Sequence, residues 1–101
     1  ARRHAVLAAT ARLLGRLAAA GARHPDLNLK NLLFTVDAAG EPRAWVLDVD
    51  RVRLRRGDRG ALAANLARLT RSLRKWRARA ALPLEEGELA FLADEARRLA
   101  A

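Results

Sequence analysis

The feature that most constrains this chain is a polar loop, residues 24–31, that leads into two short apolar runs and a second acidic motif. The loop reads His-Pro-Asp-Leu-Asn-Leu-Lys-Asn. The apolar runs, residues 32–36 and 44–49, are separated by a segment with turn-forming residues and predict a β-hairpin. Because a hairpin places its two ends side by side, we expect Asn31 and Asp48 to lie close together. The sequence therefore predicts a polar site at one end of a small hairpin.

The rest of the chain is predicted to be mostly helical. Apolar residues at helical spacing predict helices over residues 3–20 and 60–79, and Pro83 is expected to open a third. Residues 22–30 and 51–59 are expected to be loops. These elements predict an α+β fold that is mainly α-helical, in one domain over residues 1–101, with Phe34, Trp45, Trp76 and Phe91 at core positions.

Composition limits the classes of partner and site. The chain has 20 basic and 11 acidic residues, a net charge of +9, which favours phosphate-bearing or otherwise anionic partners. It has no cysteine, so disulfides and thiolate metal sites are excluded. No apolar stretch approaches the roughly 18 to 20 residues that span a bilayer.

The residue types around the hairpin point to phosphoryl transfer. Asp26 can accept the proton of an attacking hydroxyl. Asn31 and Asp48 can supply oxygen ligands to a magnesium ion on the transferred phosphate. An Asp, an Asn five residues later and a second Asp after a further apolar run is the spacing that this chemistry uses in kinases.

Three motifs carry a family resemblance. His24-x-Asp26-Leu27-x-x-x-Asn31 is similar to the catalytic loop of protein kinases and of kinase-like small-molecule phosphotransferases, and Asp48 stands at the position of their metal-binding Asp. Asn28 replaces the usual Lys, Asp48-Val49-Asp50 replaces Asp-Phe-Gly, and residues 65–75 read NLARLTRSLRK. Together these motifs resemble the lipopolysaccharide kinase family, in particular its Kdo-kinase-like members, over about residues 15–77.

The resemblance implies a fold, an activity and two cofactors. The fold would be the C-terminal lobe of a protein-kinase-like fold, with a small β-hairpin bearing the metal site. The activity would be ATP-dependent phosphorylation of a Kdo or other sugar hydroxyl of a lipopolysaccharide or lipid A precursor, with Mg²⁺. Asp26 would be the catalytic base, and Asn31 and Asp48 the metal and nucleotide ligands.

The resemblance leaves other residues with two readings each. Lys30 would contact a phosphate or remain a solvated loop lysine. Asp50 would bind a second metal ion or pair with Arg51 or Arg53. His24 is expected to be structural, and Asn65 a polar residue at the buried edge of its helix.

The resemblance also implies missing parts and a location. The 101 residues contain neither the Gly-rich strand-turn nor the Lys paired with a helical Glu that cover a kinase nucleotide, so these residues alone are expected to be inactive. The parent enzyme would work at the cytoplasmic face of a bacterial inner membrane, drawn to its anionic surface by arginines of the 60–79 helix.

Two other functions stay open at this point. Residues 46–52 match the start of haloacid-dehalogenase-like phosphatases, with Asp48 as nucleophile and Asp50 as acid/base. An Asp-x-Asp metal site of a glycosyltransferase is a weaker form of the same reading. Alternatively, the chain is a basic helical module that binds nucleic acid or another anion. The absence of a recognised nucleic-acid motif disfavours that reading.

Overall fold

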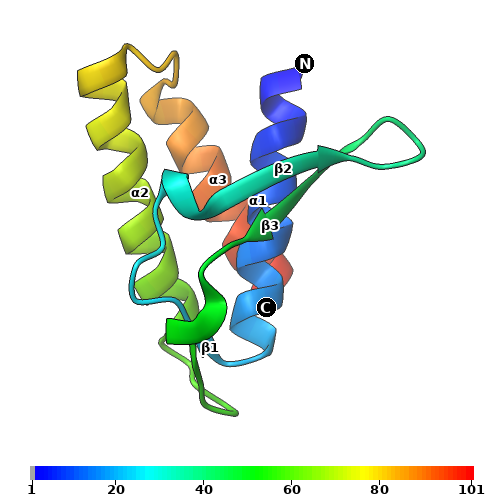
Figure 1. Ribbon diagram of the computed structural model, residues 1–101, viewed down its shortest axis with the longest axis vertical. Helices are drawn as coiled ribbons and strands as arrows, with labels where there is room; N and C mark the ends of the chain where they lie inside the picture. Colours follow the sequence, from blue (N-terminus) through cyan, green and yellow to red (C-terminus); the bar gives the residue numbers. More distant parts are fainter. Residues whose placement is uncertain (1) are drawn as a thin grey trace.

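The computed structural model describes residues 2–101, and within them it contains three α-helices and two small antiparallel sheets (Figure 1). The helices are α1 (Arg2–Ala19), α2 (Ala61–Ala80) and α3 (Glu86–Ala100). The strands are β1 (Ala22–Arg23), β2 (Leu32–Val36), β3 (Pro42–Val46) and β4 (Arg53–Leu54), and the 3₁₀ turns are η1 (Leu29–Asn31) and η2 (Val49–Arg51). The predicted α+β, mainly helical class is confirmed.

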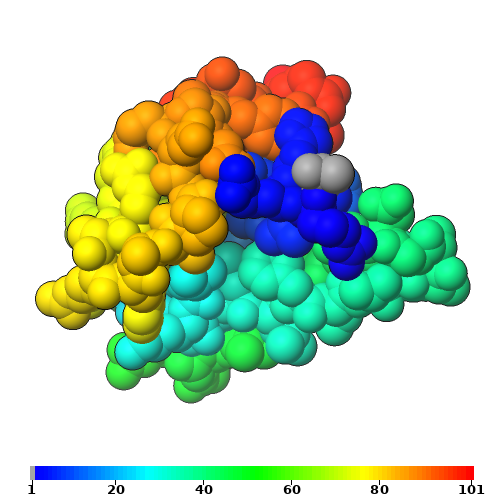
Figure 2. Space-filling view, turned by 90° about the horizontal axis from the view of Figure 1, so that it is seen from above, coloured from blue at the N-terminus to red at the C-terminus, as the bar shows by residue number. Residues whose placement is uncertain are grey.

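The three helices lie side by side, and the β2–β3 hairpin crosses one face of them (Figure 1). α2 runs antiparallel to α1 and α3. Seen from above, the turn of the hairpin projects beyond the helices at one side of the molecule (Figure 2). Arginines of α1 bond the hairpin along its length, from Arg16 at the Ala44 carbonyl to Arg2 at the Gly40 carbonyl in the turn.

Leucines from all three helices form the core. Leu14 of α1, Leu69 of α2 and Leu92 of α3 are fully buried, and Leu27 of the polar loop packs into the same cluster. α1 and α3 approach closely at Gly15, where an added Cβ would lie 3.3 Å from the Cβ of Leu99. The polar loop is thus tied to the core through its own leucine.

The hairpin pairs Leu32 with Val46 at one end and Val36 with Pro42 at the other. The prediction of residues 32–36 is confirmed, but the prediction of 44–49 is wrong in its bounds. The second strand starts at Pro42, an edge position where no ladder N–H is needed, and ends at Val46. It stops there because Asp48 adopts a left-handed conformation that an extended strand does not allow.

β1 and β4 were predicted to be loops and instead pair with each other. Ala22 lies opposite Leu54, and the Arg55 N–H donates to the Gly21 carbonyl at 2.9 Å. Gly21 has a φ of +67°, and a Cβ there would overlap the Arg55 carbonyl. The glycine that ends α1 therefore also allows residues 53–55 to pack against the chain ahead of the polar loop.

Two smaller predictions need correction. α3 begins at Glu86, after two irregular residues that follow Pro83, and the Glu85 N–H donates to Glu88 Oε1 at its start. Phe34 and Trp45 are 37% and 48% exposed, so they are not core residues. Trp45 lies on the face of the hairpin turned away from the helices, whereas Phe34 lies on the inner face, at the margin of a cavity lined by Val6 of α1. Within residues 2–101, no helix is both long and apolar enough to span a membrane.

The pair Arg23–Asp58 fixes the segment after β4 and makes a pH prediction. The side chain of Asp58 is 9% exposed and accepts hydrogen bonds from Arg23 Nε and Nη2 at 2.5 and 2.8 Å. These bonds lower the pKa of Asp58 from 3.8 to about 2. Because the folded-state pKa is below the unfolded one, the pair stabilises the fold above about pH 4 and loses this effect as the pH falls toward about 2.

We expect Asp58→Asn to lower the thermal midpoint at neutral pH and to flatten its decline between about pH 4 and pH 2. The midpoint of unfolding, followed by circular dichroism across this range, measures both effects. Asp94→Asn is the control, since Asp94 forms an exposed ion pair with Arg97 on the surface of α3. Parallel curves for Asp58→Asn and the parent protein would contradict the prediction.

Candidate active site

Two polar side chains of α2 form hydrogen bonds to the backbone of the polar loop and of β1. Asn65 is completely buried; its Oδ1 accepts from the His24 N–H at 3.0 Å and its Nδ2 donates to the Ala22 carbonyl at 2.9 Å. Seven residues along the same helix, Ser72 Oγ accepts from the Leu29 N–H at 2.9 Å. Residues spaced by seven lie on nearly the same helix face. The loop is therefore fixed to a rigid element on both sides of Asp26.

His24 connects the polar loop to the end of the hairpin. The buried ring accepts from the Asp26 N–H at Nδ1, at 3.1 Å, and its Nε2 lies 2.9 Å from the Leu47 carbonyl oxygen. Since a carbonyl only accepts, this pattern requires the tautomer with its proton on Nε2. The structural role expected for His24 is confirmed: it sets the backbone of Asp26 relative to the residue before Asp48.

Asp26 and Asn31 are oriented by each other's groups. Asn31 Nδ2 donates to the main-chain carbonyl of Asp26 at 2.7 Å, which leaves Asn31 Oδ1 free to bind a cation. The Asp26 side chain is exposed, and its contact from Asn28 Nδ2 is long, at 3.4 Å. A carboxylate with so little engagement can accept a proton from a hydroxyl placed beside it.

Asp48 lies where the hairpin brings it next to Asn31. The Leu47 N–H donates to the Asn31 carbonyl at 2.7 Å, which extends the β2–β3 pairing by one step. Asp48 itself has φ +60° and ψ +48°, a left-handed conformation that is costly for a residue other than glycine. The expectation that the hairpin brings Asn31 and Asp48 together is confirmed at the backbone. Local strain at this position favours a functional role for the carboxylate.

The donor set fits magnesium. Asn31 Oδ1 and the exposed carboxylate of Asp48 are hard oxygen ligands, and within residues 2–101 the Asp48 side chain forms no hydrogen bond or ion pair. Mg²⁺ is commonly held by one or two carboxylates together with substrate phosphates and water. Across that same range, no three His, Cys, Asp or Glu side chains gather closely enough to hold a metal by themselves. Asn31 and Asp48 would therefore supply two of the ligands of such an ion.

The structure gives partial information on Lys30 and Asp50. The Lys30 ammonium lies 5.8 Å from the ring centroid of Trp76, a cation–π contact on the α2 side of the loop. Asp50 is exposed and forms no ion pair with Arg51 or Arg53, so the expected pairing is wrong. A phosphate contact of Lys30 and a metal contact of Asp50 stay predictions.

The outer face of the hairpin is apolar beside this polar end. Leu33, Trp45 and Leu47 are each between 43% and 48% exposed. Leu33 pairs directly with Trp45, and the Leu47 N–H bonds to the Asn31 carbonyl, so this surface is continuous with Asn31 and Asp48. An exposed apolar surface thus lies directly beside the polar end of the hairpin.

Asn65 and Ser72 were the functional residues that the sequence did not assign. The available signal was a polar residue at two positions of an otherwise apolar helix face, seven residues apart. Buried polar side chains are paired, so such positions predict that something polar packs against them. The sequence alone does not identify the partners, because Ala22, His24 and Leu29 lie more than 40 residues away.

Comparison with known proteins points to one family. The model of the lipopolysaccharide kinase (Kdo/WaaP) family matches residues 1–88. A 3-deoxy-D-manno-octulosonic acid kinase of Xanthomonas oryzae pv. oryzae (strain PXO99A) is 46% identical over 69 residues, which is 68% of this chain and 26% of the relative. Its namesake in Xanthomonas campestris pv. campestris (strain B100) is 47% identical over 68 residues, 67% of the chain and 26% of the relative.

A third relative with the same name, from Stenotrophomonas maltophilia (strain K279a), is 41% identical over 68 residues, again 67% of the chain and 26% of the relative. The chain thus spans about a quarter of the length of these relatives. No solved structure matches it.

We expect Asn65→Leu to destabilise the protein strongly, because it leaves the buried His24 N–H and Ala22 carbonyl without partners. Each unsatisfied group costs about 1–3 kcal/mol. Ser72→Ala, which removes one partner, should cost less, and Thr70→Ala on the same helix should cost least. Urea unfolding followed by tryptophan fluorescence gives the three values. Equal losses for Asn65→Leu and Thr70→Ala would show that Asn65 does not anchor the loop.

Proposed function

The chain belongs to the lipopolysaccharide kinase (Kdo/WaaP) family, and from that premise we propose that the protein transfers the γ-phosphate of ATP to a sugar hydroxyl of a lipopolysaccharide precursor. The sugar is 3-deoxy-D-manno-octulosonic acid (Kdo), the acceptor in the names of the relatives. The observation that carries the proposal is the junction of Asp26, Asn31 and Asp48. The hairpin and one hydrogen bond from Asn31 to the Asp26 carbonyl join these three groups.

We further propose that residues 1–101 form the C-terminal lobe of a protein-kinase-like fold. The order of elements supports this: a helix, a polar loop on a buried anchor, a hairpin with the metal Asp after it, and a further helix beneath the loop. The family match supports it as well. The nucleotide would be covered by residues of the longer protein that this chain does not include.

The chemistry follows from the positions of the three side chains. The acceptor hydroxyl oxygen forms a bond to the γ-phosphorus of ATP while the bond from that phosphorus to ADP breaks, and the hydroxyl proton moves to an Oδ of Asp26. Asn31 Oδ1 and Asp48 would hold Mg²⁺, which when bound neutralises charge on the phosphates. His24, Asn65 and Ser72 keep the loop fixed, so that Asp26 needs little rearrangement when the hydroxyl arrives.

The apolar hairpin face supports a site for the adenine ring. Leu33 lies two residues after Asn31, and Leu47 directly precedes Asp48. Both leucine side chains remain nearly half exposed. A nucleobase stacked over them would remove this apolar area from water while its phosphates reach the metal ligands.

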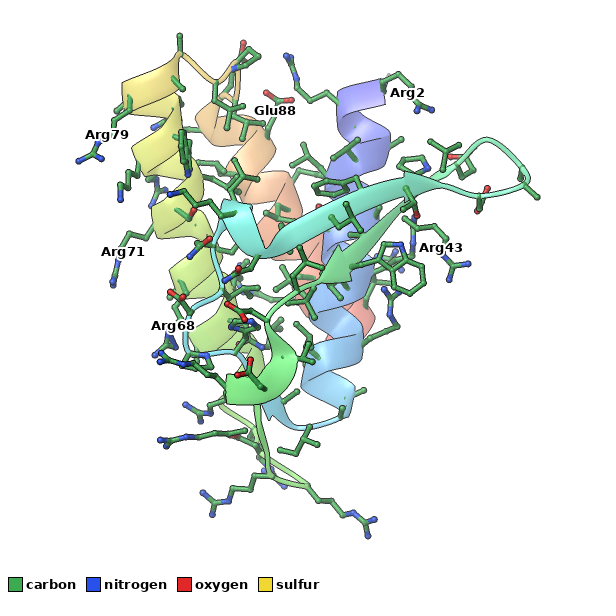
Figure 3. All side chains as sticks on the ribbon, viewed as in Figure 1. Arg2, Arg43, Arg68, Arg71, Arg79 and Glu88 are labelled. Atoms are coloured by element: carbon green, nitrogen blue, oxygen red, sulfur yellow. The ribbon has the colours of Figure 1, made fainter. Side chains whose placement is uncertain are left out.

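We also propose that the protein works as a peripheral protein at an anionic membrane surface, on the cytoplasmic side of the inner membrane where its acceptor is made. The support is a stripe of exposed cations on α2: Arg68, Arg71, Lys75 and Arg79. Figure 3 shows its three arginines projecting outward from the helix. Arg74, another arginine of the same helix, is paired with Glu86. Its charge is partly neutralised, so the stripe excludes it.

The two alternative functions receive no support. Neither the family match nor the names of the relatives points to a phosphatase or to nucleic-acid binding. Asp48 and Asp50 lie in and beside a 3₁₀ turn, whereas the phosphatase reading places them directly at the end of a strand.

The proposal predicts that the full-length protein transfers phosphate from ATP to a Kdo-containing lipid A precursor only when Mg²⁺ is present. Asp26→Asn should lower kcat by about 10²- to 10⁴-fold, the usual contribution of a general base. Asp48→Asn should abolish the response to Mg²⁺. A radiolabelled phosphate-transfer assay measures both.

Asp94→Asn, an exposed substitution on α3, is the matched control and should leave kcat unchanged. The 101-residue chain by itself should transfer no phosphate. Transfer that does not depend on Asp26, or absent transfer to any sugar acceptor, would refute the proposed reaction.

A second prediction concerns the nucleotide alone. Leu33→Asp should weaken ATP binding by about tenfold, equivalent to about 1.4 kcal/mol, because a carboxylate replaces apolar area under the base. Val36→Asp is the matched control, since Val36 lies at the other end of the same strand and is 59% exposed. Calorimetric titration of the full-length protein with ATP gives the dissociation constants. Equal effects of the two substitutions would exclude a nucleobase site at Leu33.

A further inference from the structure

A second group of cations lies beside the polar loop, and the proposed reaction gives it no role. Residues 51–59, here called the arginine segment, contain Arg51, Arg53, Arg55, Arg56 and Arg59 and one acidic residue, Asp58. Within residues 2–101, none of these five arginines forms an ion pair. Asp58 is bound by Arg23 of β1 and also interacts electrostatically with Arg55, so one carboxylate is left against five arginines of the segment.

The pairing of β1 with β4 puts two arginines opposite each other. Arg23 and Arg53 are directly opposed, an arrangement in which like charges repel and destabilise the pair. Only one carboxylate, Asp58, is available to them, and it binds Arg23. Arg53 is left exposed and without a partner among the described residues. Unrelieved repulsion between like charges, as between Arg23 and Arg53, is expected where an anionic ligand binds between them.

The conflict is located in a hollow. Arg23, Arg53, Leu54, Arg55 and Asp58 line it, and we call it the arginine hollow. Its walls are held by the main chain: the Arg55 N–H donates to the Gly21 carbonyl at 2.9 Å, and the Asp58 N–H donates to the Arg55 carbonyl at 3.1 Å. Because the backbone that carries the two free arginines is fixed, binding an anion there orders only their side chains.

One lining residue of the arginine hollow, Arg23, lies near the proposed base in the chain. Arg23 precedes Asp26 by three residues, so their Cα atoms are at most about 11 Å apart. The hairpin with the nucleotide face is on the other side of Asp26 in the chain, which leaves this side for the acceptor. The acceptor proposed above carries a carboxylate, and the paired N–H groups of arginine match a carboxylate in geometry as well as in charge.

We propose that the arginine hollow binds the carboxylate of the acceptor sugar through Arg53 and Arg55 and so directs a sugar hydroxyl toward Asp26. This inference rests on the proposed function for the identity of the acceptor. The same chemistry would also suit a phosphate of the acceptor or of a lipid headgroup, and the experiment separates these sources.

The test measures binding in the full-length protein without ATP, so that it does not depend on turnover. A water-soluble Kdo glycoside is titrated by calorimetry against the parent protein, Arg53→Gln, Arg55→Gln and a control with Arg97→Gln and Arg98→Gln on α3. The control removes two exposed positive charges elsewhere. Each substitution in the hollow should weaken glycoside binding about tenfold or more, and the control should match the parent. Equal thermal midpoints verify that the variants are folded.

The methyl ester of the glycoside completes the test. It should bind the parent as weakly as the free acid binds Arg53→Gln, and the variant should no longer distinguish acid from ester. Arg53→Lys keeps the charge but loses the bidentate donor of arginine, so its affinity for the free acid should lie between those of the parent and of Arg53→Gln.

Several results would overturn the inference. These are no binding of the glycoside to the parent, equal binding by parent and Arg53→Gln, and equal affinity for acid and ester. Binding of inorganic phosphate to the parent but not to Arg53→Gln, without binding of the glycoside, would assign the hollow to a phosphate. If Arg53→Gln loses binding to anionic phosphatidylglycerol vesicles but keeps the glycoside affinity of the parent, the hollow is assigned to the membrane. If the parent binds the glycoside but transfers no phosphate, the proposed function fails while the hollow stands.

Discussion

The buried side chain of Asn65 is the contact on which the candidate site depends. Its two ends bond the Ala22 carbonyl and the His24 N–H, which are separated by one residue, so a single amide fixes the direction in which β1 enters the polar loop. An apolar residue of similar size would fill the space but leave both main-chain groups unpaired. His24, on the anchored backbone, then transmits this position to Asp26 and to the Leu47 carbonyl.

A small domain has few ways to hold an exposed loop in one conformation, and this chain uses polar contacts more than burial. Leu27 is the loop's only fully buried leucine, and the remaining restraints are hydrogen bonds to α2, to the hairpin and within the loop. Hydrogen bonds are directional, so such a network fixes the orientation of the carboxylate and amide groups as well as their proximity to one another. The left-handed Asp48 belongs to the same network, because its neighbour Leu47 is held from both its N–H and its carbonyl.

Elements whose stabilising contacts are local were predictable from the sequence. α2 follows from its leucine spacing and β2 from a short apolar run before a turn, and both were placed within about one residue. The proximity of Asn31 and Asp48 was predictable because the two residues lie at the ends of one hairpin. β1 and β4 were not predictable, because a two-residue strand has no periodicity and these strands are stabilised by partners 30 residues away. The burial of Asn65 was predicted, but its partners, the contact of Ser72 and the Arg23–Asp58 pair were not, because these partners are set by the tertiary fold.

Two antiparallel ribbons leave the polar loop in different directions, and their surfaces differ in chemistry. The β2–β3 hairpin continues from Asn31 and presents apolar side chains, whereas β1 and β4 lie ahead of Asp26 and present arginines. A phosphotransferase must hold one partly aromatic substrate and one anionic substrate on either side of the transferred group. Apolar area contributes affinity for a base without regard to charge, while fixed guanidinium groups select for an anionic group. Because each surface is on its own ribbon, and each ribbon joins the loop only through its ends, a substitution in one surface can leave the other surface undisturbed.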